Sequence, residues 1–220
     1  MTFERSVVFG PLGIPVTSTV LASSAMVLVL ALVAAATGRR ITATPGRWQA
    51  AAEWGLGALE ALLAEMTGAS GRRYVPLVAT VAIFVLAANL MAAVPFVEAP
   101  TADINTPAAL ALVVFFSVHY FGVRELGLLG YVRKFARPMV LFLPINVLAH
   151  LTRTLSLTIR LFGNMVAHQI IVAILLVILP VLVPAVLEIF GLFIGVLQAY
   201  IFTILTIVYI GGAVRAEGEA

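Results

Sequence analysis

Long apolar runs, nearly free of charged residues, occupy most of this chain and limit what it can fold into. They cover residues 16–37, 74–94 and 106–121, followed by a region over residues 138–211 that is broken by the prolines of PVLVP, residues 180–184. About 20 apolar residues suffice for an α-helix to cross the ~30 Å hydrocarbon core of a bilayer. The sequence therefore predicts an all-α integral membrane protein.

The composition supports this class and excludes several others. Of the 220 residues, 62% are hydrophobic and 10% are charged, whereas an ordinary soluble domain has about 25% charged residues. No stretch is polar enough for a separate soluble domain, so we expect one membrane domain over residues 1–220. The chain has no cysteine, which excludes disulfides and thiolate sites. Its basic residues are spread among the apolar runs, which argues against a nucleic-acid surface.

The first two helices have different predicted relations to the bilayer. Residues 16–37 are followed closely by Arg39 and Arg40, as in a retained membrane anchor, and we predict an N-terminal transmembrane helix there. Residues 47–66 mix tryptophan and glutamate with leucine and alanine. This segment is too charged to span a bilayer, so we predict a surface amphipathic helix.

The remaining apolar runs predict four helices of two lengths. Residues 74–94 and 106–121 have the length of ordinary transmembrane helices. Residues 138–179 and 185–211 would form helices of about 60 Å and 40 Å at 1.5 Å per residue. Both exceed the thickness of the hydrocarbon core, so we predict a C-terminal hairpin of two long, strongly tilted helices.

Positively charged residues set the predicted orientation. They are Arg39, Arg40, Arg47, Arg72 and Arg73 after the first span, Arg124, Arg133, Lys134 and Arg137 after the third, and Arg215 near the end. All of them fall on the cytoplasmic side if the N-terminus is outside and the C-terminus is cytoplasmic. The loop over residues 97–106 contains Glu98 and Asp103 but no basic residue, which fits the outer side. Because no presequence is evident, we expect a bacterial cytoplasmic (inner) membrane.

Polar side chains recur at helical spacing in the first long helix. They are Asn146, His150, Arg153, Arg160, Asn164 and His168, and at 100° per residue all fall within about 40° of one direction. An arginine that faces lipid costs at least ~3 kcal/mol, so this stripe must meet protein or water. Arg153, near the helix start, has the alternative of reaching the membrane surface with its long side chain. Arg160 is followed by too many apolar residues for that.

The second long helix has a face of small and polar residues that starts at Glu188. Gly191, Gly195 and Gln198 share this face. The two glycines are spaced to let helix backbones approach closely, a common packing device. Glu188 either lines a wet cavity or is exposed at the outer surface.

Two motifs on these helices resemble one family. SLTIRLFGNM, residues 156–165, followed by LQAYIFTILTIVYI, residues 197–210, resembles subunit a of the F-type ATP synthases, the stationary membrane subunit beside the rotating ring of c subunits. NLMAAVP, residues 89–95, PTADINT, residues 100–106, and ALAL, residues 109–112, are also similar to that family. The resemblance covers roughly residues 75–212, and the two long motifs at this separation are highly specific.

The resemblance implies an ion-translocating stator subunit with two offset half-channels. Arg160 matches the essential arginine that faces the ion-carrying carboxylate of each passing c subunit. Asn164 and Gln198 match polar positions beside this arginine or along the access path, while Arg153 and Ser156 match supporting positions. The implied partners are the c-subunit ring, b-type peripheral stalk subunits and the rest of the complex.

The chain departs from the family pattern in the access path. His168 and Gln169 stand where the family often has glycine followed by glutamate or histidine, so an amide replaces the usual titratable group. Gly191 stands where the later helix usually has histidine or glutamate, and Asn146 replaces a common glutamate. We expect a rearranged inlet with proton steps on His168 and Glu188. The coupling ion, proton or sodium, stays open.

Other classes of protein fit the sequence less well. A secondary transporter usually contains internal repeats, which we do not find, and a membrane scaffold has no need of the polar stripe. The sequence lacks the GxxxxGK[S/T] phosphate-binding motif, so we expect a non-catalytic channel subunit whose partners hold the nucleotide.

We also expect no cofactor and no metal site built from the three histidines. His150 and His168 are separated by ~27 Å along one helix, at 1.5 Å per residue. His119 lies on another predicted span, where we expect a packed or interfacial histidine.

Overall fold

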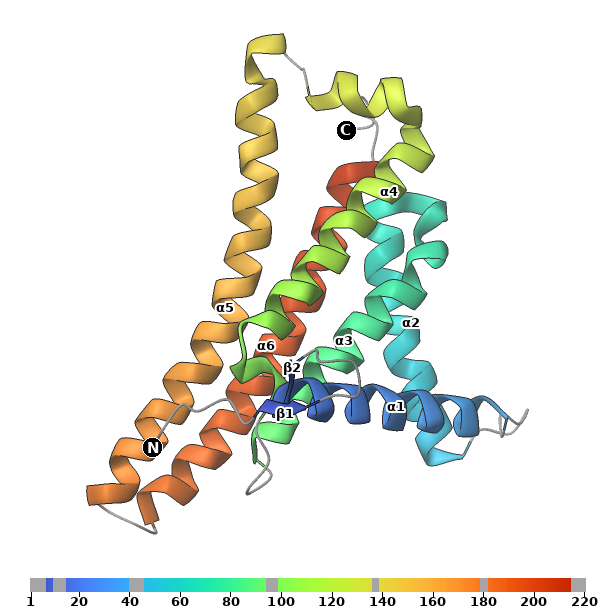
Figure 1. Cartoon of the computed structure of the whole chain (residues 1–220). Helices are drawn as coiled ribbons and strands as arrows, with labels where there is room; N and C mark the ends of the chain where they lie inside the picture. The colour runs from blue at the N-terminus through green and yellow to red at the C-terminus, as the bar shows by residue number, and fades with distance from the viewer. Residues whose placement is uncertain are drawn as a thin grey trace.

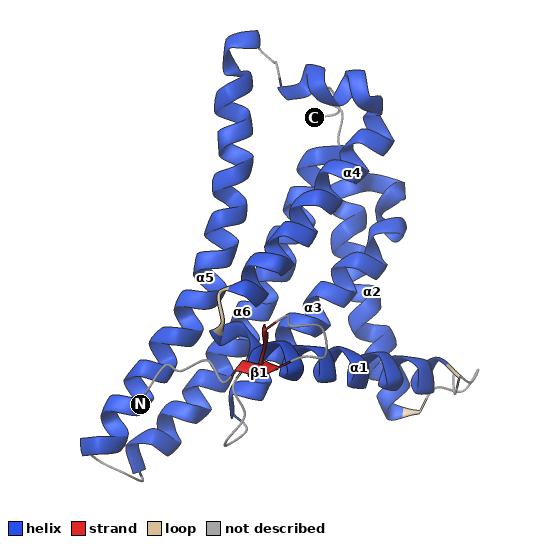
Figure 2. Ribbon diagram, viewed as in Figure 1, coloured by secondary structure: helices blue, strands red, loops and turns tan. Residues whose placement is uncertain are grey.

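The computed structural model describes residues 7–9, 15–39, 46–93, 99–135, 139–178 and 182–214. This part of the chain is almost entirely helical, as Figure 2 shows. Its elements are β1 (Val7–Phe9), β2 (Pro15–Thr17), α1 (Ser18–Gly38), α2 (Arg47–Thr67), η1 (Gly68–Tyr74), α3 (Val75–Leu90), η2 (Met91–Ala93), η3 (Pro100–Ala102), α4 (Asn105–Phe135), η4 (Val140–Phe142), α5 (Leu143–Ile178) and α6 (Leu182–Val214). The predicted all-α class is confirmed; the sequence did not predict the short antiparallel pair β1–β2.

The described helices include five that are long and apolar enough to cross a membrane. They are Thr19–Gly38, Gly71–Leu90, Asn105–Phe135, Leu143–Ile178 and Ala185–Val214. The prediction of an integral membrane protein is thereby confirmed in terms of helix length and composition. Arg40, Glu98, Arg137 and Arg215, which enter the predicted orientation, lie outside the described residues.

Helices α3, α4 and α6 form the centre of the bundle, and α5 packs against α4 and α6 (Figure 1). The buried core between these helices is apolar, and includes Val78, Val85, Val114, Leu161, Phe202 and Ile210. Helix α1 lies across one end of the bundle, where it contacts α3 and η3 (Figure 1). Burial of these side chains fixes the rotation of each helix, and therefore decides where its polar residues point.

Helix α2 packs beside α3 and α6 (Figure 1). Leu63 is fully buried, and Met66 lies so close to Gly211 of α6 that a Cβ atom at Gly211 would be 3.2 Å from the Cβ atom of Met66. At the other end of α2, Trp48 and Trp54 are exposed. The structure thus joins the predicted amphipathic helix to the bundle through its C-terminal half, and its position at the membrane surface stays a prediction.

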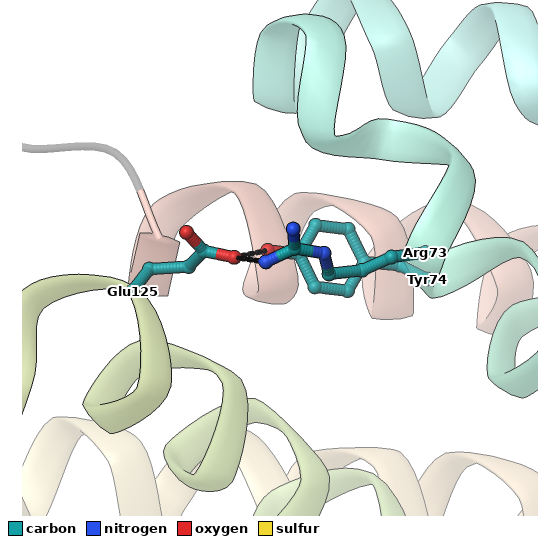
Figure 3. Close-up of polar contacts among 3 residues, drawn as sticks. All are labelled: Arg73, Tyr74 and Glu125. Carbon is teal, nitrogen blue, oxygen red and sulfur yellow. Dashed lines mark hydrogen bonds and ion pairs between the residues drawn. The ribbon is translucent and has the colours of Figure 1, made fainter.

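A polar cluster ties the end of η1, which leads directly into α3, to α4 (Figure 3). The hydroxyl group of buried Tyr74 donates a hydrogen bond of 3.0 Å to Oε1 of Glu125, and the Arg73 guanidinium pairs with the same carboxylate. The Tyr74 ring packs edge-on against Phe121, with 4.8 Å between the ring centroids. These contacts hold α3 and α4 together just before α4 changes direction.

Helix α4 extends well beyond the span predicted over residues 106–121, because it continues through a kink. Gly127 has φ 70° and ψ 161°, a backbone conformation that a side chain disfavours. The last part of α4 therefore turns away from the axis of the first (Figure 1). This turn brings Tyr131 onto Gly122, where a Cβ atom would lie 2.3 Å from Cε2 of Tyr131.

We expect Gly122→Ala to destabilise the protein by about 1–3 kcal/mol, because the new methyl group overlaps the Tyr131 ring in a packed site. Gly130→Ala on the same helix is the matched control, since its Cβ atom would have its nearest neighbour at an ordinary 3.6 Å. Thermal unfolding of the purified protein in detergent measures both. Equal unfolding temperatures for the two variants would contradict the tight Gly122–Tyr131 contact.

Candidate functional site

A pocket with several polar side chains in its lining lies where α5 and α6 meet, and we call it the inlet pocket. Its polar lining consists of Asn89, Asn164, His168, Glu188 and Gln198, together with the backbone of Gly191 and Gly195. Helices α3, α5 and α6 each contribute to it. Polar side chains that converge between apolar helices are costly unless they serve one another or water, so this pocket is a candidate functional site.

His168 and Glu188 are in direct contact at this pocket. Nε2 of His168 lies 3.6 Å from Oε2 of Glu188, a distance at which a protonated imidazole and a carboxylate form an ion pair. The His168 side chain is 16% exposed and the Glu188 side chain 42% exposed. Glu188 is therefore the more exposed member of the pair, and His168 is the more buried one.

The glycines on α6 make room for this arrangement. A Cβ atom at Gly191 would lie 2.3 Å from Cε1 of His168, so the imidazole occupies the space that a side chain at position 191 would need. One helical turn further, a Cβ atom at Gly195 would be 3.1 Å from the Cβ atom of Asn89 on α3. The two glycines thus allow α6 to pack closely against two different helices, α5 at Gly191 and α3 at Gly195.

Three amides continue the polar lining toward the interior. Nδ2 of Asn164 donates a hydrogen bond of 2.8 Å to Oε1 of Gln198, and Nδ2 of Asn89 donates one of 3.0 Å to the carbonyl oxygen of Gly195. Among the described residues, Oδ1 of Asn89 and Nε2 of Gln198 are buried without a hydrogen-bond partner. Buried polar atoms in such a position are usually satisfied by water, so these amides fit a hydrated path.

Arg160 lies on α5 one turn before Asn164, about 6 Å away along the helix axis. It is half-buried, and within the described part of the chain no carboxylate or carbonyl group accepts a hydrogen bond or ion pair from its guanidinium. The neighbouring Ile159 and Leu155 of α5 are exposed, so this helix has an uncovered apolar face. A permanent charge in such a position fits a partner on another chain.

A second pocket lies on the other side of Arg160, and we call it the histidine pocket. His119 of α4, His150 and Arg153 of α5, and Tyr209 of α6 contribute its polar lining. The centroids of the two imidazole rings are 5.4 Å apart. The Arg153 guanidinium lies over the Tyr209 ring, 5.7 Å from its centroid, a cation–π contact.

The predicted site residues thus divide among several environments. Asn164, His168, Glu188 and Gln198 share the inlet pocket, whereas His150 and Arg153 line the histidine pocket. Asn146 instead donates a hydrogen bond of 2.8 Å to the carbonyl oxygen of Phe135 at the end of α4. Gln169 and Ser156 are exposed, and neither lines the inlet pocket or the histidine pocket.

Sequence reasoning missed two lining residues. Asn89 is an amide within the apolar helix α3, which is by itself a signal for a functional position. His119 was separated from His150 because it lies on another helix, yet the fold brings the two rings together. No group of three or more histidine, aspartate, glutamate or cysteine side chains in the described residues could hold a metal ion.

Comparison with known proteins gives a consistent result. The family described as "ATP synthase A chain" matches residues 18–211. The chain is 43% identical to "ATP synthase subunit a 2" of Bradyrhizobium over 210 residues, which cover 96% of this chain and 93% of that protein. It is 41% identical to "ATP synthase subunit a" of Moorella thermoacetica over 219 residues, 99% of this chain and 100% of the relative.

We expect Gly191→Ala to destabilise the protein by about 1–3 kcal/mol, because a methyl group at that position overlaps the His168 ring. Adding His168→Ala removes the obstacle, and the double variant should regain most of that stability. Gly212→Ala, on the same helix with open space around it, is the control. Thermal unfolding in detergent measures the three variants, and additive losses in the double variant would contradict the contact.

Proposed function

The chain belongs to the ATP synthase A chain family, and we propose that it is the stationary ion-conducting membrane subunit of a rotary F-type ATP synthase. It is a multi-pass membrane protein of a family concerned with ATP synthesis and ion transport. In this proposal the described helices act as one membrane domain.

The position of Arg160 carries the proposal. Along α5, His168 lies about 12 Å from Arg160 on one side and His150 about 15 Å on the other, at 1.5 Å per residue. Each histidine lines one of the two pockets, and Arg160 lies between the two histidines along α5. This arrangement supports two offset half-channels that do not connect directly within the chain.

The chemistry follows from the cost of moving charge through lipid. A carboxylate on a ring of c subunits has to be neutral while it crosses the hydrocarbon, because an isolated charge is strongly disfavoured there. Next to a guanidinium within about 4–6 Å, the pKa of a carboxyl group falls by about 1–3, so the ion is released. Arg160 would therefore unload each passing acid, and the acid would reload from the other pocket.

Arginine suits this role better than lysine. A guanidinium keeps its proton even when partly buried, whereas a lysine ammonium can lose its proton under the same conditions. Arg160 can thus attract each carboxylate without passing a proton from one pocket to the other. The driving force would be the membrane potential, which contributes about 2.3 kcal/mol per charge per 100 mV.

The inlet pocket would supply protons from the outer side. Glu188, the more exposed of the pair, would exchange protons with solvent, and His168 would pass them inward. Asn164 and Gln198 would hold water between His168 and Arg160. In this proposal His168 takes the place of the titratable group that the family usually has at position 191, and Gln169 has no part in the path.

The partners and the orientation complete the proposal. The exposed apolar face of α5 would meet the c ring, and b-type peripheral stalk subunits would hold the chain in place. The N-terminus would be outside and the C-terminus cytoplasmic, in a bacterial inner membrane.

The nucleotide site would lie on partner subunits. We propose the proton as the coupling ion because histidine exchanges protons near neutral pH.

We expect Arg160→Ala to abolish ATP-driven ion pumping in vesicles that contain the assembled complex. Arg160→Lys should fail as well, because the role requires a permanent planar charge. Arg124→Ala, which removes an exposed arginine of α4, should pump normally. Pumping is measured with and without sodium, which distinguishes the two ions. Coupled pumping by Arg160→Ala would contradict the proposed function.

We also expect Arg160→Cys to form a disulfide with a cysteine placed next to the mid-membrane carboxylate of subunit c. The chain contains no other cysteine, so the background is clean. Thr158→Cys is the control, because Thr158 is buried and points to the opposite side of α5. Cross-linking is measured on gels after mild oxidation. Equal yields at both positions would contradict the predicted contact with the ring.

A further inference from the structure

The histidine pocket contains two titratable rings to which the proposed function has assigned no individual role. His119 on α4 and His150 on α5 are both half-buried, and their ring centroids are 5.4 Å apart. Phe135 packs against both rings, at 4.8 Å from His150 and 6.2 Å from His119 between centroids. Two imidazoles held this close at the junction of α4, α5 and α6 form a defined site rather than scattered surface groups.

A hydrogen bond sets which nitrogen of His119 is free. Nδ1 of His119 lies 2.7 Å from the carbonyl oxygen of Phe115, one turn earlier on α4. A carbonyl oxygen only accepts, so the proton is on Nδ1, and Nε2 is the basic nitrogen of the neutral ring. His119 is thus oriented by its own helix to take up and release a proton at Nε2.

The kink of α4 is what positions the pocket. Tyr131 and Phe135 follow the turn at Gly127, and both pack against the His119 ring, at 5.9 Å and 6.2 Å between centroids. The only other charged or titratable groups that we place at this pocket, among the described residues, are Arg153, Tyr209, Tyr131 and Lys134. None of them is a carboxylate, so the imidazoles are the groups at this pocket whose unperturbed pKa lies nearest to neutral.

We propose that the His119–His150 pair is the proton relay of the second half-channel, on the side of Arg160 opposite the His168–Glu188 pair. This inference rests on the proposed function, because it needs an acid that is unloaded at Arg160. When that acid ionises, its O–H bond breaks and the proton passes through water to an imidazole Nε2, where an N–H bond forms. The imidazolium then gives the proton to bulk water, and the carboxylate stays behind near Arg160. The reverse direction uses the same steps.

The test uses chemical rescue in inverted vesicles that contain the complete ATP synthase. ATP-driven transport is followed as membrane potential, because added imidazole is a permeant base that would collapse a pH gradient. In these vesicles the cytoplasmic face is outside, so imidazole has direct access to the side on which we place the pocket. The variants are His119→Ala, His150→Ala and the double variant.

We expect the double variant to transport at least several-fold more slowly than the native complex, and imidazole to restore much of its rate. Imidazole should leave the native rate unchanged. Phe135→Leu is the matched control, because it disturbs the same ring cluster without removing a titratable group. A native rate in the double variant, a loss that imidazole does not relieve, or equal rescue of Phe135→Leu would overturn the proposal.

His119→Gln and His150→Gln keep the measurement decisive if the alanine variants fail to assemble. Glutamine retains a hydrogen-bond donor of similar length but cannot exchange protons near neutral pH. We expect these variants to assemble and to transport several-fold more slowly than the native complex. A native rate would overturn the relay. Arg160→Ala is measured alongside: if it is inactive while both histidines are dispensable, only the relay is wrong. If Arg160→Ala transports, the proposed function itself fails.

Discussion

A permanent positive charge within an apolar helix is the constraint on which this structure depends. Arg160 cannot face lipid without a cost of at least about 3 kcal/mol, and it cannot lose its proton to avoid that cost. Its own chain, as far as the structure describes it, offers no carboxylate to pair with. The charge is therefore tolerable only if water or a partner reaches it, and in the proposed function the pockets on either side would supply the water.

Close helix contacts keep those pockets small and defined. Gly191 lets the His168 ring lie against the backbone of α6, and Gly195 lets Asn89 of α3 donate to its carbonyl group. A larger residue at either position would push away a polar side chain that lines the inlet pocket. On α4, Gly122 and Gly127 permit the close packing around the histidine pocket. They let Tyr131 and Phe135 turn back toward His119.

Helical spacing correctly predicted which residues share a face of the same helix. It placed Asn164 and His168 on one face of α5 and Gln198 on the same face of α6 as Gly191, and these faces meet in the structure. It could not predict which parts of different helices meet, because that depends on packing across the bundle. Pairing of His119 with His150 was missed for this reason.

Asn146 and Gln169 lie outside the two pockets for local reasons. Asn146 shares the angular position of the polar stripe, but it lies at the start of α5, where the free carbonyl group of Phe135 is within reach. Gln169 follows His168 directly, and a step of 100° turns it away from the pocket. The angular position of a residue on its helix therefore does not predict whether it lines a pocket, because its position along the helix axis matters as well.

In the proposed function, the separation of the two pockets explains why a stationary chain would need a moving partner. His150 and His168 are about 27 Å apart along α5, with the apolar residues Leu157 and Leu161 buried between them. A continuous chain of water past Arg160 would let protons cross without doing work, whereas a guanidinium blocks such a path because it does not give up its proton. In the proposed function, an ion would pass from one pocket to the other only on a carboxyl group of a partner that moves past Arg160. The separation of the pockets within the subunit would then couple ion flow to movement of the ring.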